Sequence, residues 1–225
     1  MSTLKSYYQL TADEIYEDVK SSHENTKHFV EDVGFVVFPH VYPSHKFRTT
    51  GFVLRNLKDL VKGKTICDMG CGPGVVGLYA LKNGAKKVVQ ADINSYAIEN
   101  AKENNKMNGF KRSQIESYVS DCFDNVPLQM FDLIIFNMPY HRDDIEIADP
   151  LQRAFYDPNF NSIKKFLSQS ETFVHEGTQI FIAFSNKGDT AGLESAFEKS
   201  NFQWELWKTI NSEEQFDNRI YLLQL

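Results

Sequence analysis

From residue 65 onward, short apolar runs alternate with segments whose apolar residues recur at helical spacing. The runs TICDM (65–69) and FDLIIF (131–136) are apolar at most positions, as in strands that are buried on both faces. Strands that alternate with helices form a parallel sheet that is covered on both faces. The pattern therefore predicts an α/β fold with a seven-stranded, mostly parallel sheet, helices on both faces, and one antiparallel strand from the final hairpin.

Local start and stop signals indicate the individual elements of this region. Asn94 is a good N-cap for a helix that Gly109 ends, and Asp157-Pro158 reads as the N-cap and first position of another helix. The expected strands are 65–69, 86–91, 115–120, 131–136, 177–185, 202–210 and 219–225. The expected helices are 75–83, 94–108, 157–170 and 189–200.

The first part of the chain has a different pattern. Thr11 and Glu14 match a capping box, which predicts a helix to about residue 30. The run VGFVVFP (33–39) has the composition of a strand that its final proline stops.

A further helix is expected over residues 51–61, with Thr50 available as its N-cap. We expect residues 1–45 to form a cover of helix and strand over the sheet. Residues 46–225 would then form the main domain.

Composition limits what kind of protein this is. The chain of 225 residues is 42% hydrophobic, which is enough for one full core. Its net charge of -6 argues against binding to nucleic acid by bulk electrostatics, although local basic patches remain compatible with it. The N-terminus lacks the basic start and apolar core of a signal peptide, and no apolar run approaches the roughly 18 residues of a membrane span. We therefore expect no membrane association.

Cysteine and histidine usage points to a cytoplasmic protein without a metal site. Cys67, Cys71 and Cys122 are odd in number and form no CxxC pair, as expected in a reducing compartment. The six histidines show no metal-binding spacing such as HExxH.

Polar residues stand where four of the expected strands end. Asp68, Asp92 and Asp121 end or follow three successive strands, and Asn137 ends the fourth. Each alone would be an ordinary solvated strand end. In an open parallel sheet, however, ligands bind in the crevice at the carboxyl ends of the strands. Four polar ends at one edge therefore predict a ligand site there.

A glycine-rich turn, DMGCGPG (68–74), joins the first of these strands to its helix. Its glycines remove side chains where the chain bends and where a ligand can approach backbone N–H groups. The letters also match a dinucleotide-binding fingerprint that starts at Gly72. That fingerprint should follow the strand more closely, and an anionic pyrophosphate would lie near Asp68 without basic compensation. A cationic ligand would instead be attracted to this acid.

Three segments together carry a family resemblance. ICDMGCGPGVVGL, followed by VVQADIN and NMPY, resembles the class I S-adenosylmethionine-dependent methyltransferases over roughly residues 47–209. More narrowly, it is similar to their small-domain group, which carries Asn-Pro-Pro-Tyr after the fourth strand. That group methylates exocyclic amines in nucleic acids and glutamine amides in translation factors. The resemblance implies a Rossmann-like sheet and S-adenosyl-L-methionine as the cofactor.

The resemblance also implies roles at the cofactor site. The glycines of the turn lie against the methionine part of the cofactor, and Asp68 lies near its amino group or orders the turn. Asp92 accepts hydrogen bonds from both ribose hydroxyls. Asp121 and Cys122 face the adenine, and Ile93 contacts adenine or ribose unless it only packs in the core. The expected cofactor-binding residues are Asp68, Gly70, Cys71, Gly72, Gly74, Asp92, Ile93, Asp121, Cys122 and Asn137.

The segment Asn137–Tyr140 suits methyl transfer to a planar nitrogen, whose lone pair is delocalised. Two acceptors, one for each N–H, would turn that lone pair toward the methyl group, and the Asn137 side-chain oxygen and Met138 carbonyl supply them. Pro139 forces Met138 into an extended conformation, and Tyr140 offers a flat face for stacking. The family usually has proline where Met138 stands, but a backbone acceptor does not need the ring. The alternative is a simple strand-end turn.

Other residues have two interpretations each. Phe47 and Thr50 precede or begin a helix where related enzymes have site residues, although a simple cap explains Thr50 better. Arg142 could contact an anionic substrate group or be a solvated charge. Tyr156 could line a lid over the site or only pack.

The sequence thus predicts an S-adenosylmethionine-dependent N-methyltransferase that acts on a planar amide or amine nitrogen. The acceptor is a protein glutamine, a nucleobase or a small molecule, and the acidic charge slightly favours protein or small molecule over nucleic acid. The first ~45 residues are short for the helical recognition domain of release-factor methylases. Alternatives are non-methylating chemistry on the same cofactor or a catalytically inert partner subunit. An NAD-dependent dehydrogenase is the weakest alternative.

Overall fold

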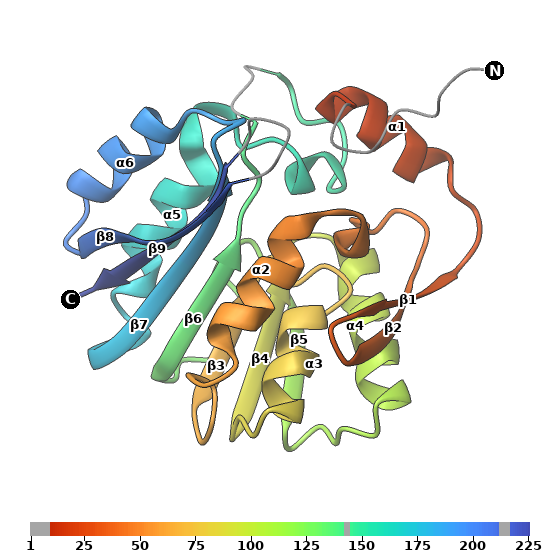
Figure 1. Ribbon diagram of the computed structural model, residues 1–225, viewed down its shortest axis with the longest axis horizontal. Coiled ribbons are helices and arrows are strands. Elements are labelled where there is room, and N and C mark those ends of the chain that lie inside the picture. The colour runs from red at the N-terminus through yellow and green to blue at the C-terminus, as the bar shows by residue number, and fades with distance from the viewer. Residues whose placement is uncertain (1–9, 142–144, 212–216) are drawn as a thin grey trace.

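The computed structural model describes residues 10–141, 145–211 and 217–225. Within these residues a seven-stranded sheet has the order β5-β4-β3-β6-β7-β9-β8 (Figure 1). Strands β5, β4, β3, β6 and β7 are parallel, and β9 is antiparallel to both β7 and β8. The strands are β3 (Thr65–Met69), β4 (Lys87–Asp92), β5 (Ile115–Val119), β6 (Phe131–Asn137), β7 (Val174–Ser185), β8 (Gln203–Asn211) and β9 (Asp217–Gln224). The predicted fold class, with its single antiparallel strand, is confirmed.

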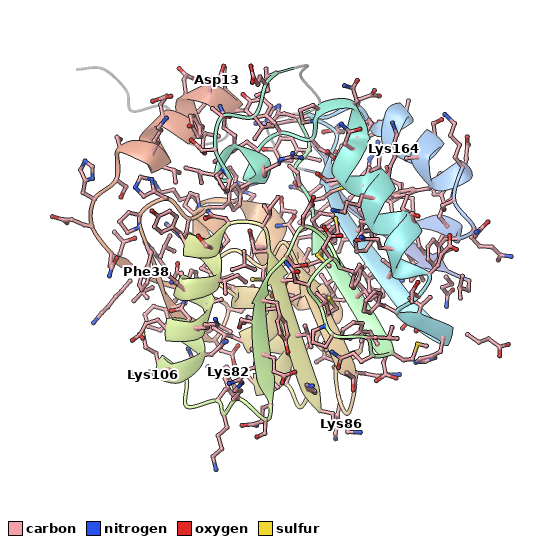
Figure 2. All side chains as sticks on the ribbon, turned by 180° about the vertical axis from the view of Figure 1, so that it is seen from behind. Asp13, Phe38, Lys82, Lys86, Lys106 and Lys164 are labelled. Carbon is pink, nitrogen blue, oxygen red and sulfur yellow. The ribbon has the colours of Figure 1, made fainter. Side chains whose placement is uncertain are left out.

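Alternate residues of each strand point to opposite faces of the sheet, so both faces need a cover. A different set of helices covers each face. On one face, residues such as Ile66 and Leu133 pack with α2 (Arg48–Leu57) and α3 (Val75–Lys82). On the other face, residues such as Cys67 and Ile134 pack with α5 (Asn161–Ser170) and α6 (Thr190–Glu198). Figure 1 shows α2 and α3 in front of the sheet, and Figure 2, seen from behind, shows α5 on the opposite face.

The expected helix over 11–30 is wrong in its second half. The capping box of Thr11 and Glu14 is present, but α1 (Ala12–Ser21) ends at Ser21. Residues Thr26–Val30 instead form β1, which pairs antiparallel with β2 (Val33–Val37). The sequence TKHFV carries β-branched and aromatic residues, and pairing with β2 satisfies its backbone groups, so the strand replaces the helix.

The free edge of β2 is held by asparagines of α4 (Ser95–Met107), the helix that Asn94 caps as predicted. Asn104 accepts from the Val36 amide at 2.8 Å and donates to the Val36 carbonyl at 2.8 Å. Asn100, one turn earlier, donates to the same carbonyl and accepts from the amide of Phe38. Side-chain amides spaced four residues apart thus replace a neighbouring strand.

Two predicted helix starts are corrected. Helix α2 begins at Arg48, not after residue 50, and Thr50 lies buried inside it rather than capping it. Helix α5 begins at Asn161 after the short 3₁₀ turn Pro158–Phe160 (η4). Phe160, not Asp157, occupies the N-cap position of α5, so the predicted cap and helix start were both too early. The Asp157 carboxylate still accepts from the amides of Ser162 and Ile163 in the first helical turn.

The glycine turn after β3 allows a test of its packing against β4 and α4. Gly74 has φ +84°, and an added Cβ would lie 2.5 Å from Nε2 of Gln90. The Gln90 side chain is fully buried and its amide donates to the Gly74 carbonyl at 3.1 Å, so it cannot move aside freely. Gly63 has φ +73° with open space around a Cβ.

We therefore expect Gly74→Ala to lower the free energy of unfolding by about 2 kcal/mol or more, from both backbone strain and overpacking. Gly63→Ala, which adds only the backbone strain, should cost about 1 kcal/mol. Urea denaturation of both variants measures the difference. Equal losses would contradict the proposed close packing at Gly74.

Candidate active site

All but one of the predicted cofactor-binding and catalytic residues meet in one cleft at the carboxyl ends of the parallel strands. Its empty volume is about 1180 Å³, which includes space open to solvent. Gly74 does not line the cleft; it packs against Gln90 and Ala101 instead. The predicted residues that do line it are Asp68, Gly70, Cys71, Gly72, Asp92, Ile93, Asp121, Cys122, Asn137, Met138, Pro139 and Tyr140.

The Asp92 carboxylate ties two loops of the site together. One oxygen accepts from the Gly72 amide at 2.9 Å, and the other accepts from the Asn94 amide at 2.9 Å. Each carboxylate oxygen can accept more than one hydrogen bond, so both can still accept from a pair of hydroxyls. Burial raises the pKa of Asp92, while the two amides oppose that rise.

Asp68 is a buried acid that faces the cleft without a cation. It is 3% exposed, and its only described hydrogen bond comes from the Gly77 amide at 2.9 Å. Burial raises the pKa of Asp68 to about 7, the nearby charge of Asp92 adds to the rise, and the Gly77 amide opposes it. A positively charged ligand would favour the ionised form, whereas an anionic pyrophosphate would be repelled.

The segment before α2 and the first turn of α2 form the opposite wall. Tyr42, Ser44, Thr49 and Thr50 line the cleft. The hydroxyl oxygens of Ser44 and Thr50 are buried and have no hydrogen-bond partner among the described residues. A buried hydroxyl without a partner is destabilising, so two of them at a cleft indicate a polar ligand that completes their bonds.

Sequence reasoning missed Tyr42 and Ser44, because an aromatic residue and a serine near two prolines carry no signal of their own. Of the two candidates it named in this region, Thr50 lines the cleft and Phe47 does not. Phe47 stacks on the ring of Tyr42, with centroids 4.9 Å apart and planes 12° apart. It therefore supports a wall of the cleft from behind.

Asp121 and Cys122 lie in the loop after β5. The Asp121 carboxylate accepts from Nζ of Lys165 on α5 at 2.8 Å, a contact that sequence reasoning did not foresee. Cys122 has φ +52°, and its carbonyl accepts from the Ser120 hydroxyl at 2.8 Å, which holds the loop in shape. Burial raises the pKa of Cys122 to about 12, so its thiol is neutral. The adenine-facing role of both residues stays a prediction.

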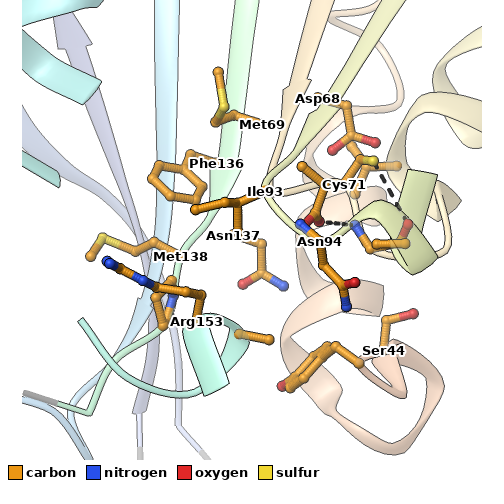
Figure 3. A pocket seen from close by; sticks show the side chains of 18 of the residues that line it. Ser44, Asp68, Met69, Cys71, Ile93, Asn94, Phe136, Asn137, Met138 and Arg153 are labelled. Carbon is orange, nitrogen blue, oxygen red and sulfur yellow. Dashed lines mark hydrogen bonds between the residues drawn. The ribbon is translucent and has the colours of Figure 1, made fainter. Parts of the chain in front are cut away.

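Asn137 ends β6 and presents its amide to the cleft. Figure 3 shows this amide between Phe136 and Met138 on one side and Asn94 and Ser44 on the other. The half-buried side chain makes no hydrogen bond to another described residue, so its oxygen is available as an acceptor.

Met138, Pro139 and Tyr140 continue the same wall. The Met138 amide donates to the Ala183 carbonyl at 3.3 Å, and no described backbone amide donates to the Met138 carbonyl. The Met138 side chain is buried in the core, 3% exposed, whereas its backbone lies at the cleft. The Tyr140 ring meets Phe184 edge to face, at 6.4 Å and 87°. The position of Met138 thus contributes a backbone acceptor and an apolar anchor.

The segment after this motif adds three unpredicted residues to the cleft, Pro150, Arg153 and Ala154, whereas the candidate Tyr156 lies outside it. Arg153, on the 3₁₀ turn Gln152–Ala154 (η3), lines the cleft and was not predicted. Tyr156 is buried, and its hydroxyl donates to Asp13 of α1 at 2.6 Å rather than lining the cleft. Arg142 lies outside the described residues.

The described residues offer neither a cluster of metal ligands nor a membrane-spanning helix. They contain no group of three His, Cys, Asp or Glu side chains arranged to hold a metal ion. They also contain no helix with the length and apolar character needed to cross a bilayer. The expectation of no metal site stays a prediction.

The buried acid gives a pH test. Because the pKa of Asp68 is about 7 in the fold and near 3.8 when unfolded, the native state binds the extra proton between these values. The free energy of unfolding should therefore fall as pH rises from about 4 to about 7, by up to a few kcal/mol. We expect Asp68→Asn to lose this component of the pH dependence. Urea denaturation at about pH 5 and about pH 8 measures it, and parallel curves for both proteins would refute the assignment.

Parts of the chain are similar in sequence to known methyltransferases. MJ0928 of Methanocaldococcus jannaschii, provisionally named a protein N5-glutamine methyltransferase, is 40% identical over 128 residues, which are 56% of this chain and 61% of that protein. The ribosomal RNA small subunit methyltransferase C of Haemophilus influenzae is 28% identical over 155 residues, covering 68% of this chain and 42% of that protein. The chain thus spans less than two thirds of the length of these relatives.

Solved structures agree in fold. The 16S rRNA N2 G1207 methyltransferase of T. thermophilus, crystallised with AdoMet and guanosine, has a TM-score of 0.66 at 16% identity, covering 89% of this chain and 50% of that one. The ribosomal protein L11 methylase of Lactobacillus delbrueckii has a TM-score of 0.62 at 20% identity, covering 84% of each chain. A family model described as the methyltransferase small domain matches residues 32–203. The chain therefore belongs to the methyltransferase small-domain family.

Proposed function

We propose that the protein is an S-adenosylmethionine-dependent N-methyltransferase that acts on a planar amide or amine nitrogen. The observation that carries this proposal is the Asn137 amide, which has no partner among the described residues and shares one cleft with Asp92 and the glycine turn. Membership of the methyltransferase small-domain family supports the reaction class.

The cleft residues fit the cofactor. S-adenosylmethionine supplies an electrophilic methyl group on a positively charged sulfonium. Asp92 would accept both ribose hydroxyls with the lone pairs that its two loop contacts leave free. Asp68 would hold the cationic ammonium group, and the unpartnered hydroxyls of Ser44 and Thr50 would bond polar atoms of the ligand. Gly72, with open space where a Cβ would stand, lets the ligand approach the backbone.

Asn137 and Met138 would orient the acceptor nitrogen. The Asn137 side-chain oxygen and the Met138 carbonyl each accept one N–H, which directs the nitrogen lone pair into the cleft. Neither group needs to ionise, so this arrangement works at neutral pH. Tyr140 would stack on the planar acceptor, and its edge-to-face contact with Phe184 holds the ring. Positioning of this kind supplies much of the rate enhancement.

The other functions considered are less well supported. A dinucleotide would bring its pyrophosphate to Asp68, a buried acid with no described cation beside it. An inert partner subunit would not need the unpartnered Asn137 amide next to an acidic residue suited to ribose. Methyl transfer uses both features.

The acceptor class, the location and the division of the chain stay proposals. The relatives are named for methylation of a protein glutamine or of ribosomal RNA. The net charge of -6 favours a protein or small-molecule acceptor over nucleic acid. The free cysteines fit a cytoplasmic location. Helix α1 packs on residues 151–156, which supports the N-terminal part as a cover near the cleft.

Calorimetry tests the cofactor. We expect S-adenosylmethionine to bind and NADH not to bind. Asp92→Ala should weaken S-adenosylmethionine binding by roughly ten- to a hundredfold, because charged hydrogen bonds to both ribose hydroxyls are lost. Asp59→Ala, at an exposed carboxylate outside the cleft, is the matched control. Thermal unfolding shows whether each variant folds. If Asp92→Ala does not fold, Asp92→Asn, which keeps one acceptor oxygen, is measured in its place. Binding of NADH alone would overturn the cofactor assignment.

Labelled S-adenosylmethionine incubated with cell extract, fractionated into protein, RNA and small molecules, tests the reaction. We expect Asn137→Ala to lower methyl incorporation by roughly a hundredfold or more, because one oriented acceptor is lost at the reacting nitrogen. Its affinity for S-adenosylhomocysteine should stay near that of the unchanged protein. Asn201→Ala, at an exposed asparagine away from the cleft, is the control. Unchanged incorporation in Asn137→Ala would show that the two-acceptor mechanism is wrong.

A further inference from the structure

Arg153 is the single lysine or arginine among the described residues that line the cleft. It was not singled out by the sequence, and the roles proposed above do not use it. The carboxylates of the cleft, by contrast, belong to Asp68, Asp92 and Asp121. Figure 3 shows Arg153 on the Met138 side of Asn137, across the cleft from Asp68 and Cys71. The cleft is therefore acidic at the proposed cofactor end and basic at the other end.

The Arg153 guanidinium is not held by other groups of the fold. It makes no hydrogen bond or ion pair to another described residue. Its charge slightly lowers the pKa of Asp157, but burial of Asp157 is the larger effect and raises it. Both Asp157 oxygens already accept backbone amides, from Ser162 at 2.7 Å and from Ile163 at 3.1 Å. Asp157 therefore serves the start of α5, and the guanidinium can bind a ligand.

The turn that carries Arg153 is held firmly. Just before it, the Asp149 carboxylate accepts from the Leu151 amide at 3.0 Å, and Tyr16 and Lys20 of α1 contact the same carboxylate. The Phe155 ring, just after it, packs on Tyr16 edge to face at 6.3 Å. An arginine presented from a fixed backbone loses less entropy on binding than one on a free loop.

We propose that Arg153 forms an anion-binding subsite, so that the methyl acceptor carries a carboxylate near its planar nitrogen. This inference rests on the proposed function, because the acceptor side of the cleft is defined by Asn137. Guanidinium and carboxylate are matched in shape and form two parallel hydrogen bonds. The acceptor would thereby be recognised at two points: Asn137 binds its nitrogen, and Arg153 binds its carboxylate.

The surroundings favour a carboxylate on a peptide or small molecule over the phosphates of a nucleic acid. Helix α1, which buttresses the Arg153 turn, carries the acids Asp13, Glu14, Glu17 and Asp18. The described part of the cleft wall adds no second cation. The phosphate backbone of a nucleic acid needs several cations along its path, whereas one arginine is enough to bind one carboxylate.

The test uses a matched pair of probes that both present the planar amide. N-acetylglutamine carries a carboxylate, and N-acetylglutamine methylamide does not. Each is titrated into the 225-residue protein with and without S-adenosylhomocysteine, and binding is followed by NMR. The side-chain Nε–Hε signal of Arg153 is assigned by its loss in Arg153→Lys. We expect the acidic probe to bind about tenfold more tightly than the neutral one and to shift this signal.

Arg153→Gln should remove the preference for the acidic probe, and the matched control Arg112→Gln, at an exposed arginine outside the cleft, should keep it. Equal binding of the two probes, no detectable binding of the acidic probe, or a preference that survives in Arg153→Gln would each overturn the subsite. Adenosine monophosphate and adenosine form the second pair. A preference for the phosphate that depends on Arg153, without one for the carboxylate, would overturn the proposal in favour of a nucleotide acceptor.

Titration with S-adenosylhomocysteine alone separates the two proposals. If it fails to bind, the proposed function fails, and the probe pair without cofactor still tests Arg153. If S-adenosylhomocysteine binds while the probes show no charge preference, only the proposal of an anion subsite is rejected.

Discussion

Parallel pairing of β3, β4, β5 and β6 is the constraint on which the site depends. Parallel strands have their carboxyl ends at one edge of the sheet, so residues far apart in sequence meet there. Asp92 ends β4 and Asn137 ends β6, and both border one cleft. The Asp92 carboxylate then holds the turns after β3 and β4 in one arrangement through the amides of Gly72 and Asn94. The shape of the proposed cofactor site thus follows from the sheet and from this one side chain.

Several groups in the cleft lower the stability of the folded protein when no ligand is bound. Burial raises the pKa of Asp68 to about 7, which means that ionising this acid at neutral pH opposes folding. The hydroxyls of Ser44 and Thr50 are buried without described partners. Groups of this kind persist where a ligand completes their interactions, and they support the proposal that the cleft binds a ligand. The large cores on both faces of the sheet offset such costs.

The N-terminal elements reach the cleft through contacts that no local pattern shows. Helix α1 packs on the turn that carries Arg153, and the Tyr156 hydroxyl bonds Asp13 across 143 positions of sequence. The hairpin of β1 and β2 is fastened by Asn100 and Asn104 of α4. In the sequence these asparagines look like ordinary polar residues of an exposed helix face. Only the packed chain shows that their amides bond a strand.

The sequence alone determined the order of elements from residue 65 onward, the parallel sheet and the convergence of Asp68, Asp92 and Asn137. It could do so because apolar runs, glycines and caps are local signals that define strands and helices. Any parallel sheet built from such strands brings their carboxyl ends together. It could not determine that residues 26–30 form a strand, that Thr50 is buried without capping, or that Gly74 packs away from the cleft. Nor could it find Lys165 beside Asp121 or Arg153 in the cleft wall. These depend on which distant side chains pack together, and only the tertiary structure decides that.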